Sequence, residues 1–231
     1  MIKGFRGTSV VDYPGKIASV VFLGGCNWRC PYCYNVDLVL PERLKNLPDL
    51  PEEGILSDLL RRKGFIKGVV ITGGEPTIWG RRLKAFLERI KYETKLAVKL
   101  DTNGSNPELV ASLLAEGLVD YLAMDFKTAP SRYSELSADF EPVEKTLELL
   151  KDLNGCAEVR ITLAPGLVAK QDLEEMLPYL KRVKRVALQK FVPEAETLAP
   201  DFPRPSLPPD TVSSLADYLR KHLSAEILIR C

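Results

Sequence analysis

The chain has little of several features that would point to common classes of function. Its single histidine, His222, leaves no evident general base and no Ser-His-Asp triad. Basic and acidic residues are balanced, 32 against 31, so the composition does not favour a nucleic-acid partner. No stretch approaches the roughly 18 uninterrupted apolar residues of a membrane span, and residues 1–6 lack the apolar core of a secretory signal. The sequence therefore predicts a cytoplasmic protein without a membrane partner.

Cysteine is scarce except in one stretch. Three of the five cysteines, Cys26, Cys30 and Cys33, fall within eight residues at the spacing C-x3-C-x2-C. Thiolates so close in sequence cannot all form disulfides, and soft sulfur ligands select zinc, copper(I) or the iron of iron–sulfur clusters. A closed zinc site needs four ligands, and no second cysteine or histidine pair is present. Three thiolates suit a cubane cluster whose fourth iron stays open to a small-molecule ligand, which indicates chemistry rather than a structural role.

The two remaining cysteines are isolated in sequence. We expect Cys156 to be a small buried residue, because free cysteine packs like a small hydrophobic side chain. Cys231 is expected to be a chain end. Neither residue is predicted to bind the cluster.

Apolar runs typical of buried parallel strands alternate with amphipathic helical patterns. The expected strands are 17–23, 67–71, 95–100, 119–124, 157–163 and 185–192, with a short further strand at 225–229. The expected helices are 51–63, 81–92, 107–116, 142–153, 171–181 and 210–223, the last capped by Asp210. We expect a turn-prone lead-in at 7–16, an irregular segment at 34–50 and one domain spanning residues 1–231. Within it, 24–35 forms the cluster loop, and 193–231 holds a proline-rich connector and a helix.

Six strand–helix repeats imply parallel strands with right-handed crossovers. No G-x-G-x-x-G opens the first repeat, which argues against a dinucleotide-binding fold. The periodicity alone does not separate an open sheet from a barrel.

Two motifs together resemble the signature of the radical S-adenosylmethionine (SAM) enzymes. The cysteine motif directly follows an apolar strand and has the aromatic Tyr32 before its third cysteine. One strand–helix repeat later, the chain reads Gly73-Gly74-Glu75-Pro76, which is that superfamily's second hallmark. The resemblance implies a (β/α)6 partial TIM barrel with its chemistry at the carboxyl ends of the strands. It also implies a [4Fe–4S] cluster on the three cysteines, whose open iron chelates the amino and carboxylate groups of SAM.

Within the superfamily, the chain is most similar to the anaerobic ribonucleoside-triphosphate reductase activating proteins, which are activating enzymes of glycyl-radical proteins. The similarity rests on the segments 12–16 (Asp-Tyr-Pro-Gly-Lys), 125–127 (Asp-Phe-Lys) and 188–193 (Leu-Gln-Lys-Phe-Val-Pro). The chain departs from the family at Tyr34 and Asn35, where a histidine often follows the third cysteine. The resemblance implies an electron from a flavodoxin- or ferredoxin-type donor and cleavage of SAM to methionine and a 5′-deoxyadenosyl radical. That radical would take a hydrogen atom from a glycine of a partner enzyme, such as anaerobic ribonucleotide reductase.

The resemblance also assigns cofactor contacts to the strand ends. The residues implied to contact SAM are Tyr32, Gly73, Gly74, Glu75, Pro76, Asp101, Thr102, Asn103, Asp125, Lys127, Arg160 and Gln189. Among them, Asp101 and Asp125 would hold a monovalent cation beside SAM, and Lys127 would pair with the SAM carboxylate. The residues by themselves equally allow helix caps, turn stabilisers and surface cations at these places. Arg160 lies inside an apolar strand and should therefore have a partner.

Two rival functions stay open at this point. The first is a radical SAM enzyme that modifies a small molecule or a tRNA base. The second is a non-catalytic iron–sulfur or zinc-binding electron carrier, which the motif Gly73-Gly74-Glu75-Pro76 disfavours because a carrier needs no SAM site. Since little sequence follows the sixth strand, we expect an open lateral side with residues 34–50 at its rim. This feature favours a protein substrate.

Overall fold

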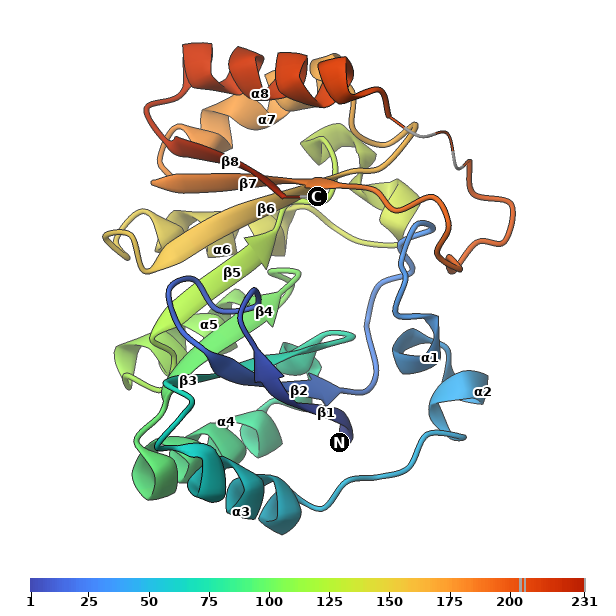
Figure 1. The fold of residues 1–231 in the computed structure, drawn as a ribbon. Coiled ribbons are helices and arrows are strands. Elements are labelled where there is room, and N and C mark those ends of the chain that lie inside the picture. Colours follow the sequence, from blue (N-terminus) through green and yellow to red (C-terminus); the bar gives the residue numbers. More distant parts are fainter. Residues whose placement is uncertain (204, 206, 231) are drawn as a thin grey trace. The chain divides into compact units, whose positions relative to one another are not determined.

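The structure is a computed structural model that describes residues 1–203, 205 and 207–230 (Figure 1). Within these residues the strands form one sheet whose spatial order follows the sequence. The strands are β1 (Ile2–Ser9), β2 (Ala18–Leu23), β3 (Gly68–Gly73), β4 (Ala97–Thr102), β5 (Tyr121–Asp125), β6 (Ala157–Leu163), β7 (Arg185–Lys190) and β8 (Glu226–Arg230). β1 is antiparallel to β2, whereas β2, β3 and β4 are parallel, as are β6, β7 and β8. The predicted α/β class and the short final strand are confirmed.

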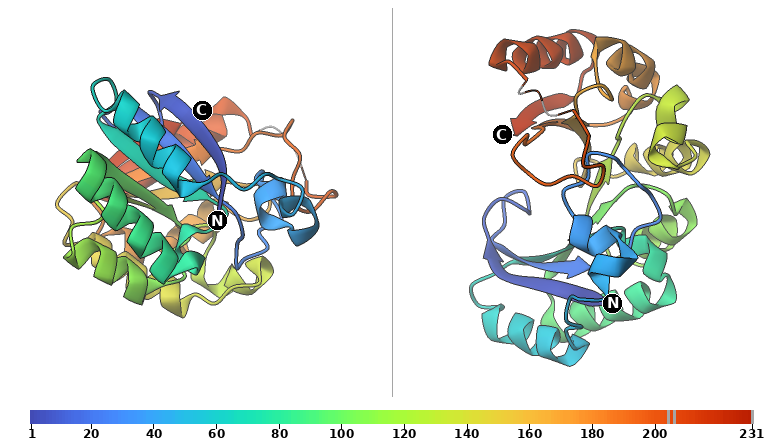
Figure 2. Two further views of the ribbon diagram at one scale, coloured as in Figure 1. Left: turned by 90° about the horizontal axis from the view of Figure 1, so that it is seen from below. Right: turned by 90° about the vertical axis from the view of Figure 1, so that its right-hand side faces the viewer.

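The chain divides into two compact units. Unit 1 comprises residues 1–27, 35–102 and 108–122. Its helical segments are α1 (Val36–Val39), α2 (Pro41–Leu44), α3 (Glu52–Arg62), the 3-10 turn η1 (Pro76–Trp79), α4 (Arg81–Arg89), the π-helical turn η2 (Ile90–Thr94) and most of α5 (Pro107–Ala115). Helices α3 and α4 lie side by side (Figure 1, Figure 2), and Arg89 of α4 pairs with Glu53 of α3 at 2.6 Å.

Unit 2 comprises residues 28–34, 103–107 and those from 123 onward. Its helical segments are η3 (Pro130–Leu136), α6 (Glu141–Leu150), α7 (Lys170–Leu180) and α8 (Pro209–His222). Helices α7 and α8 cover one face of β7 and β8 (Figure 1, Figure 2). Arg230 of β8 donates two hydrogen bonds, at 2.7 and 2.6 Å, to the fully buried carboxylate of Glu158 on β6. Because a buried charge needs a partner, this pair holds the last strand in place.

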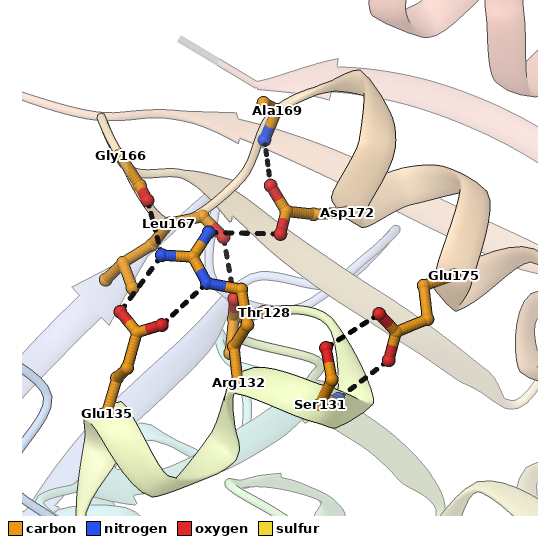
Figure 3. Close-up of polar contacts among 9 residues, drawn as sticks. All are labelled: Thr128, Ser131, Arg132, Glu135, Gly166, Leu167, Ala169, Asp172 and Glu175. Carbon is orange, nitrogen blue, oxygen red and sulfur yellow. Dashed lines mark hydrogen bonds and ion pairs between the residues drawn. The ribbon is translucent and has the colours of Figure 1, made fainter.

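The segment after Lys127 is anchored to the loop between β6 and α7 (Figure 3). Arg132 of η3 donates to Asp172 at 3.0 Å and to the carbonyl of Gly166 at 2.6 Å. Thr128 donates its hydroxyl proton to the carbonyl of Leu167 at 2.6 Å. These bonds place the turn that carries Lys127 relative to β6, which carries Arg160.

The amino-terminal strand was not predicted. The lead-in expected at 7–16 begins inside β1, which runs to Ser9. Glycine and charged residues are poor strand formers, and β1 is an edge strand with only Ile2 and Ser9 buried, so its alternation is weak. The strand forms because backbone groups of β2 are available to pair with it.

Other element boundaries also differ from the predictions. The segment 34–50 contains α1 and α2 instead of being irregular throughout. Helix α8 has Pro208 at its N-cap with no side-chain cap, so the predicted capping role of Asp210 is wrong. β3 and β4 extend to Gly73 and Thr102, so parts of both motifs belong to the strands themselves. Among the described residues, no helix is both long and apolar enough to span a bilayer.

The prediction of a buried Cys156 is wrong, because this cysteine is exposed. It ends a tight turn between α6 and β6 in which Asn154 and Gly155 both have positive φ. Its backbone N–H donates to the carbonyl of Leu153 at 2.7 Å. The turn therefore places the side chain at the surface. Cys231 lies outside the described residues. His222 is exposed, as predicted.

Candidate active site

In unit 1, the glycine turn at the end of β3 is hydrogen-bonded to the residues that precede the first cysteine. The N–H of Gly74 donates to the carbonyl of Leu23 at 3.0 Å, and that of Glu75 donates to Gly25 at 2.8 Å. A Cβ added to Gly74 would lie 2.0 Å from the Gly25 oxygen and 3.2 Å from Cβ of Cys26. Only glycine permits this approach, so the glycine turn is in contact with the start of the cysteine loop.

The far side of the cysteine loop also returns to this turn. Asn35 donates its side-chain amide to the carbonyl of Gly73 at 3.0 Å. Asn35 is one of the two positions at which the chain departs from the resembling family. Its amide gives it a structural role that the sequence reasoning missed, since only the fold brings it to Gly73.

The carboxylate of Glu75 joins the ends of β3 and β4. Its Oε1 accepts hydrogen bonds from the N–H of Thr77 at 3.0 Å, from the Thr77 hydroxyl at 2.6 Å and from the Thr102 hydroxyl at 2.8 Å. The side chain is 1% exposed. Hydrogen bonds to a buried carboxylate are strong, so this residue fixes the turn in which Pro76 begins η1.

Asp101, near the end of β4, has a cationic neighbour that was not predicted. The ammonium of Lys99 donates a short hydrogen bond to Asp101 Oδ1. The two side chains are 2% and 12% exposed. Residues i and i+2 of a strand share one face, which is the signal that could have revealed the pair. Further along, Asn103 Oδ1 accepts from the N–H of Ser105 at 2.9 Å and so stabilises the following turn.

In unit 2, Asp125 at the end of β5 is paired with two cations. Arg160 Nε of β6 donates to Asp125 Oδ1 at 2.7 Å, and Lys127 Nζ donates to Oδ2 at 3.1 Å. Burial disfavours ionisation, but the charges and hydrogen bonds of Arg160 and Lys127 outweigh it and hold the pKa of Asp125 at about 2. The predicted partner of Arg160 is therefore found, and both cations reach the same carboxylate.

Lys127 lies in the electrostatic field of the cysteine loop. Burial disfavours its charged form, but Asp125 raises the pKa of Lys127, and Tyr32, Cys30 and Cys33 raise it further, to well above its usual value. The ammonium therefore stays charged at any physiological pH. The charges of Cys30 and Cys33 thus act on this lysine in the direction that keeps it protonated.

Two buried tyrosines beside Lys127 differ in their hydrogen bonding. The hydroxyl of Tyr133 accepts from the backbone N–H of Lys127 at 3.3 Å. The hydroxyl of Tyr32 is buried without a hydrogen-bond partner. Burial raises the pKa of both hydroxyls, so both are neutral donors at neutral pH.

The connector after β7 is hydrogen-bonded to the cysteine loop. The N–H of Leu198 donates to the carbonyl of Cys33 at 3.0 Å, and that of Ala199 donates to Pro31 at 2.9 Å. We call residues 197–202 the strap. The sequence predicted only a proline-rich connection here, because these contacts join residues more than 160 positions apart.

Aromatic rings reinforce the strap. Phe202 contacts Tyr32 with ring centroids 6.1 Å apart, and it contacts Phe191 at 5.6 Å. Phe191 in turn contacts Tyr34 at 5.5 Å. The loop residues on both sides of Cys33 are therefore packed against residues that follow β7.

The predicted roles of some residues have no test in these contacts. Gln189 lies opposite Thr162 in the register of β7 and β6, and its contact with SAM stays a prediction. Among the described residues, no three His, Cys, Asp or Glu side chains are already gathered as a metal site. The ligand roles of Cys26, Cys30 and Cys33 also stay predictions.

A family model, the radical SAM superfamily, matches residues 20–180. The chain belongs to the radical SAM superfamily. A Methanocaldococcus jannaschii protein, provisionally named a glycyl-radical enzyme activating enzyme, is 33% identical over 203 residues, which cover 84% of this chain and 81% of that protein. The pyruvate formate-lyase-activating enzyme of Streptococcus mutans is 28% identical over 198 residues, which cover 79% of this chain and 73% of that enzyme. The 7-carboxy-7-deazaguanine synthase of Hyperthermus butylicus is 26% identical over 199 residues, which cover 77% of this chain and 80% of that enzyme.

Two solved structures share this fold. Streptococcus suis SuiB bound to its precursor peptide SuiA superposes with a TM-score of 0.70 at 13% identity, over 92% of this chain and 48% of SuiB. The structure of anSMEcpe with bound AdoMet superposes with a TM-score of 0.63 at 18% identity, over 89% of this chain and 61% of anSMEcpe. The present chain spans about half the length of SuiB. The predicted partial TIM barrel of the radical SAM type is confirmed.

The residues fit a [4Fe–4S] cluster and SAM, the groups that the superfamily implies. Thiols are the ligands that such clusters take. In unit 1, the glycine at position 74 brings its backbone close to Cys26. In unit 2, the Tyr32 hydroxyl is a buried donor without a partner, and Lys127 is a permanent cation. The two residues predicted to hold a monovalent cation each pair with cationic side chains: Asp101 with Lys99 in unit 1, and Asp125 with Lys127 and Arg160 in unit 2.

Proposed function

We propose that this radical SAM enzyme abstracts a hydrogen atom from a glycine of a partner enzyme, of which anaerobic ribonucleotide reductase is the leading candidate. The observation that carries the proposal is the 33% identity to a provisionally named glycyl-radical enzyme activating enzyme across most of both chains. The identity to a pyruvate formate-lyase-activating enzyme supports the same reaction class.

The cluster would be held by the thiolates of Cys26, Cys30 and Cys33. When bound, the cluster and SAM together supply one-electron reductive cleavage, with the electron from a flavodoxin- or ferredoxin-type donor. The protein has to hold SAM in one orientation. The protein also has to exclude from the site other groups that could react with the radical in place of the substrate.

Lys127 suits the carboxylate of SAM, because its ammonium is charged and sits among the groups of the cysteine loop. Asp125 and Arg160 keep Lys127 in place. The Asp125 carboxylate accepts hydrogen bonds from both Lys127 and Arg160, and the charge of Arg160 helps to keep that carboxylate ionised. A lysine held this way can bind an anion without a large loss of side-chain entropy. The glycine turn offers backbone groups to the SAM amino group, and Tyr32 offers its hydroxyl to a polar atom of the ligand.

The decisive experiment has two stages. The purified chain is reconstituted anaerobically, reduced with dithionite and mixed with SAM, and 5′-deoxyadenosine is measured. We expect wild-type turnover and a loss of about 100-fold in Lys127→Met. Lys145→Met, which removes an exposed lysine that pairs with Glu141 at 2.8 Å, is the matched control and should keep wild-type turnover.

The second stage adds the anaerobic ribonucleotide reductase of the same organism. A glycyl-radical doublet in the electron paramagnetic resonance spectrum is expected with wild-type protein and not with Lys127→Met. Steady SAM cleavage without a doublet would overturn the protein-substrate proposal and leave SAM chemistry intact. No SAM cleavage by a cluster-loaded chain would favour the electron-carrier rival.

A second candidate is modification of a small molecule or of a tRNA base. The specific observation in its favour is the 26% identity to a 7-carboxy-7-deazaguanine synthase over 77% of this chain. It predicts that a purine-like small molecule or a tRNA stimulates SAM cleavage, whereas the reductase does not.

A further inference from the structure

The pair Lys99–Asp101 lies where the resemblance implied a monovalent cation bound near Asp101. Alkali-metal ions bind hard oxygen ligands such as carboxylates. At Asp101 that carboxylate oxygen already accepts a short hydrogen bond from the Lys99 ammonium. Lys99 is 2% exposed, which is rare for lysine and requires a compensating charge.

An ammonium resembles a small alkali ion in its charge and in how it binds oxygen. It is a compact unit charge with three donors, and it has no preference for a planar acceptor. Because it is tethered to the same strand as Asp101, its local concentration does not depend on the salt of the medium. A second cation on Asp101 would also meet the repulsion of the Lys99 charge.

The position of the pair connects it to the SAM site. Thr102, next to Asp101, donates to Glu75, and Glu75 fixes the turn whose Gly74 lies against Cys26. A charge imbalance at Asp101 would therefore disturb the strand end that supports the glycine turn. The other predicted ligand of the cation is Asp125. Its charge is balanced by two cationic side chains, Lys127 and Arg160.

We propose that the ammonium of Lys99 takes the place of the monovalent cation at Asp101, so that SAM cleavage by this chain needs no alkali-metal ion. Lys99 is thus a positioning residue that neutralises Asp101. The inference rests on the SAM-cleavage step of the proposed function and is independent of the substrate that follows it.

The test compares K⁺, Na⁺ and the bulky organic cation N-methyl-D-glucamine, each as chloride at an ionic strength of about 0.1 M. For wild type, the rate of 5′-deoxyadenosine formation and the thermal midpoint of the cluster-free protein should be the same in all three salts. In Lys99→Met, K⁺ or Na⁺ should raise the midpoint by about 5 °C and the cleavage rate by about tenfold, both saturably. The matched control Lys84→Met removes a half-buried lysine that pairs with Glu116, and it should show no response.

The double variant Lys99→Met/Asp101→Asn removes the Asp101 carboxylate charge together with the Lys99 ammonium. It should fold without alkali ions and lose the salt response. Because stability is measured on cluster-free protein, this arm is informative even if no SAM cleavage is found, which would count against the proposed function alone. Saturable activation or stabilisation of wild type by K⁺ or Na⁺ would overturn the inference. A Lys99→Met protein with no alkali response in either measurement would overturn it as well.

Discussion

At the scale of single residues, charge pairing dominates the site of unit 2. Asp125 stays ionised although it is partly buried, because Arg160 and Lys127 share its two oxygens. Lys127 stays protonated although burial opposes it, chiefly because of Asp125. Each group thus keeps the other charged, and the stability of the unit is tied to pH through the carboxylate.

The ionised Asp125 should make unfolding free energy depend on pH in the acid range. The pKa of Asp125 is about 2 in the folded protein, against an ordinary value of 3.8 in an unfolded chain. A lowered folded pKa gives stability that is complete above the unfolded value and is lost as the pH falls through the folded value. We expect wild type to lose about 2 kcal/mol between about pH 5 and pH 2 through this group, a loss that Asp125→Asn does not show.

Urea unfolding of cluster-free protein at a series of pH values measures this. Asp37→Asn serves as the matched control, because Asp37 pairs with Arg43 at an exposed position. It should keep the wild-type pH profile. If the unfolding free energy of Asp125→Asn fell between about pH 5 and pH 2 as steeply as that of wild type, the loss could not be assigned to Asp125.

Because the Tyr32 hydroxyl has no hydrogen-bond partner, its removal should change stability and SAM binding in opposite directions. In Tyr32→Phe, removal of a buried hydroxyl without a partner should raise the unfolding free energy of the ligand-free protein by about 1 kcal/mol. SAM affinity, measured by equilibrium dialysis on cluster-loaded protein, should fall by about tenfold. Tyr133→Phe is the control, because it leaves the N–H of Lys127 without an acceptor and should lower stability by about 1 kcal/mol. A Tyr32→Phe protein that loses stability would show that the hydroxyl has a partner in the free protein.

At the scale of elements, the strap changes the role of the connector after β7. Its backbone donates to the carbonyls of Pro31 and Cys33, and its Phe202 packs on Tyr32. Residues 31–33 of the cysteine loop, which belong to unit 2, are thus held by a segment far along the chain. Since residues 198–201 of the strap are half-buried or exposed, it should open locally at a lower free energy than the buried strands do.

Phe202→Ala should loosen the loop and expose its thiols. In the cluster-free protein, we expect Cys33 to react with iodoacetamide about tenfold faster than in wild type, as read by mass spectrometry. Cys156 is exposed and provides an internal reference whose rate should not change. Phe65→Ala, at a side chain that is 59% exposed, is the control variant. Equal Cys33 rates in Phe202→Ala and wild type would show that the strap does not restrain the loop.

At the scale of the whole molecule, the strands follow each other across the sheet in sequence order, and two compact units share the chain. Cys26 belongs to unit 1, whereas Cys30 and Cys33 belong to unit 2. The motif residues of both units occur at or next to the carboxyl ends of strands, as in other barrels built from β–α repeats.

The iron content of the whole chain tests the predicted ligand set. Wild type reconstituted anaerobically should carry about four iron atoms. Alanine variants of Cys26, Cys30 and Cys33 should each lose most of that iron. Those of Cys156 and Cys231 should keep it, which makes them the matched controls. Equal losses in Cys156→Ala and Cys30→Ala would show that the assignment is wrong.

Much of the fold and part of the site could be predicted from local pattern. Apolar runs and helical periodicity identified β2 to β8, because each strand's burial is encoded by its own residues. The cysteine spacing and the glycine motif identified the superfamily. The need of Arg160 for a partner followed from a charge within an apolar strand, and the fold provided that partner as Asp125.

The tertiary structure alone decided which groups distant in sequence became neighbours. The bond from Asn35 to Gly73, the strap on the cysteine loop and the pairing of β1 depend on contacts between segments whose own patterns carry no trace of them. Lys99 lies only two residues from Asp101, yet its burial, on which its proposed role as a substitute for a bound ion rests, depends on neighbouring strands and helices. Sequence thus determined the elements and the chemistry of the motifs. Packing determined which charges are satisfied and where, because the free energy of a buried charge depends on all groups around it.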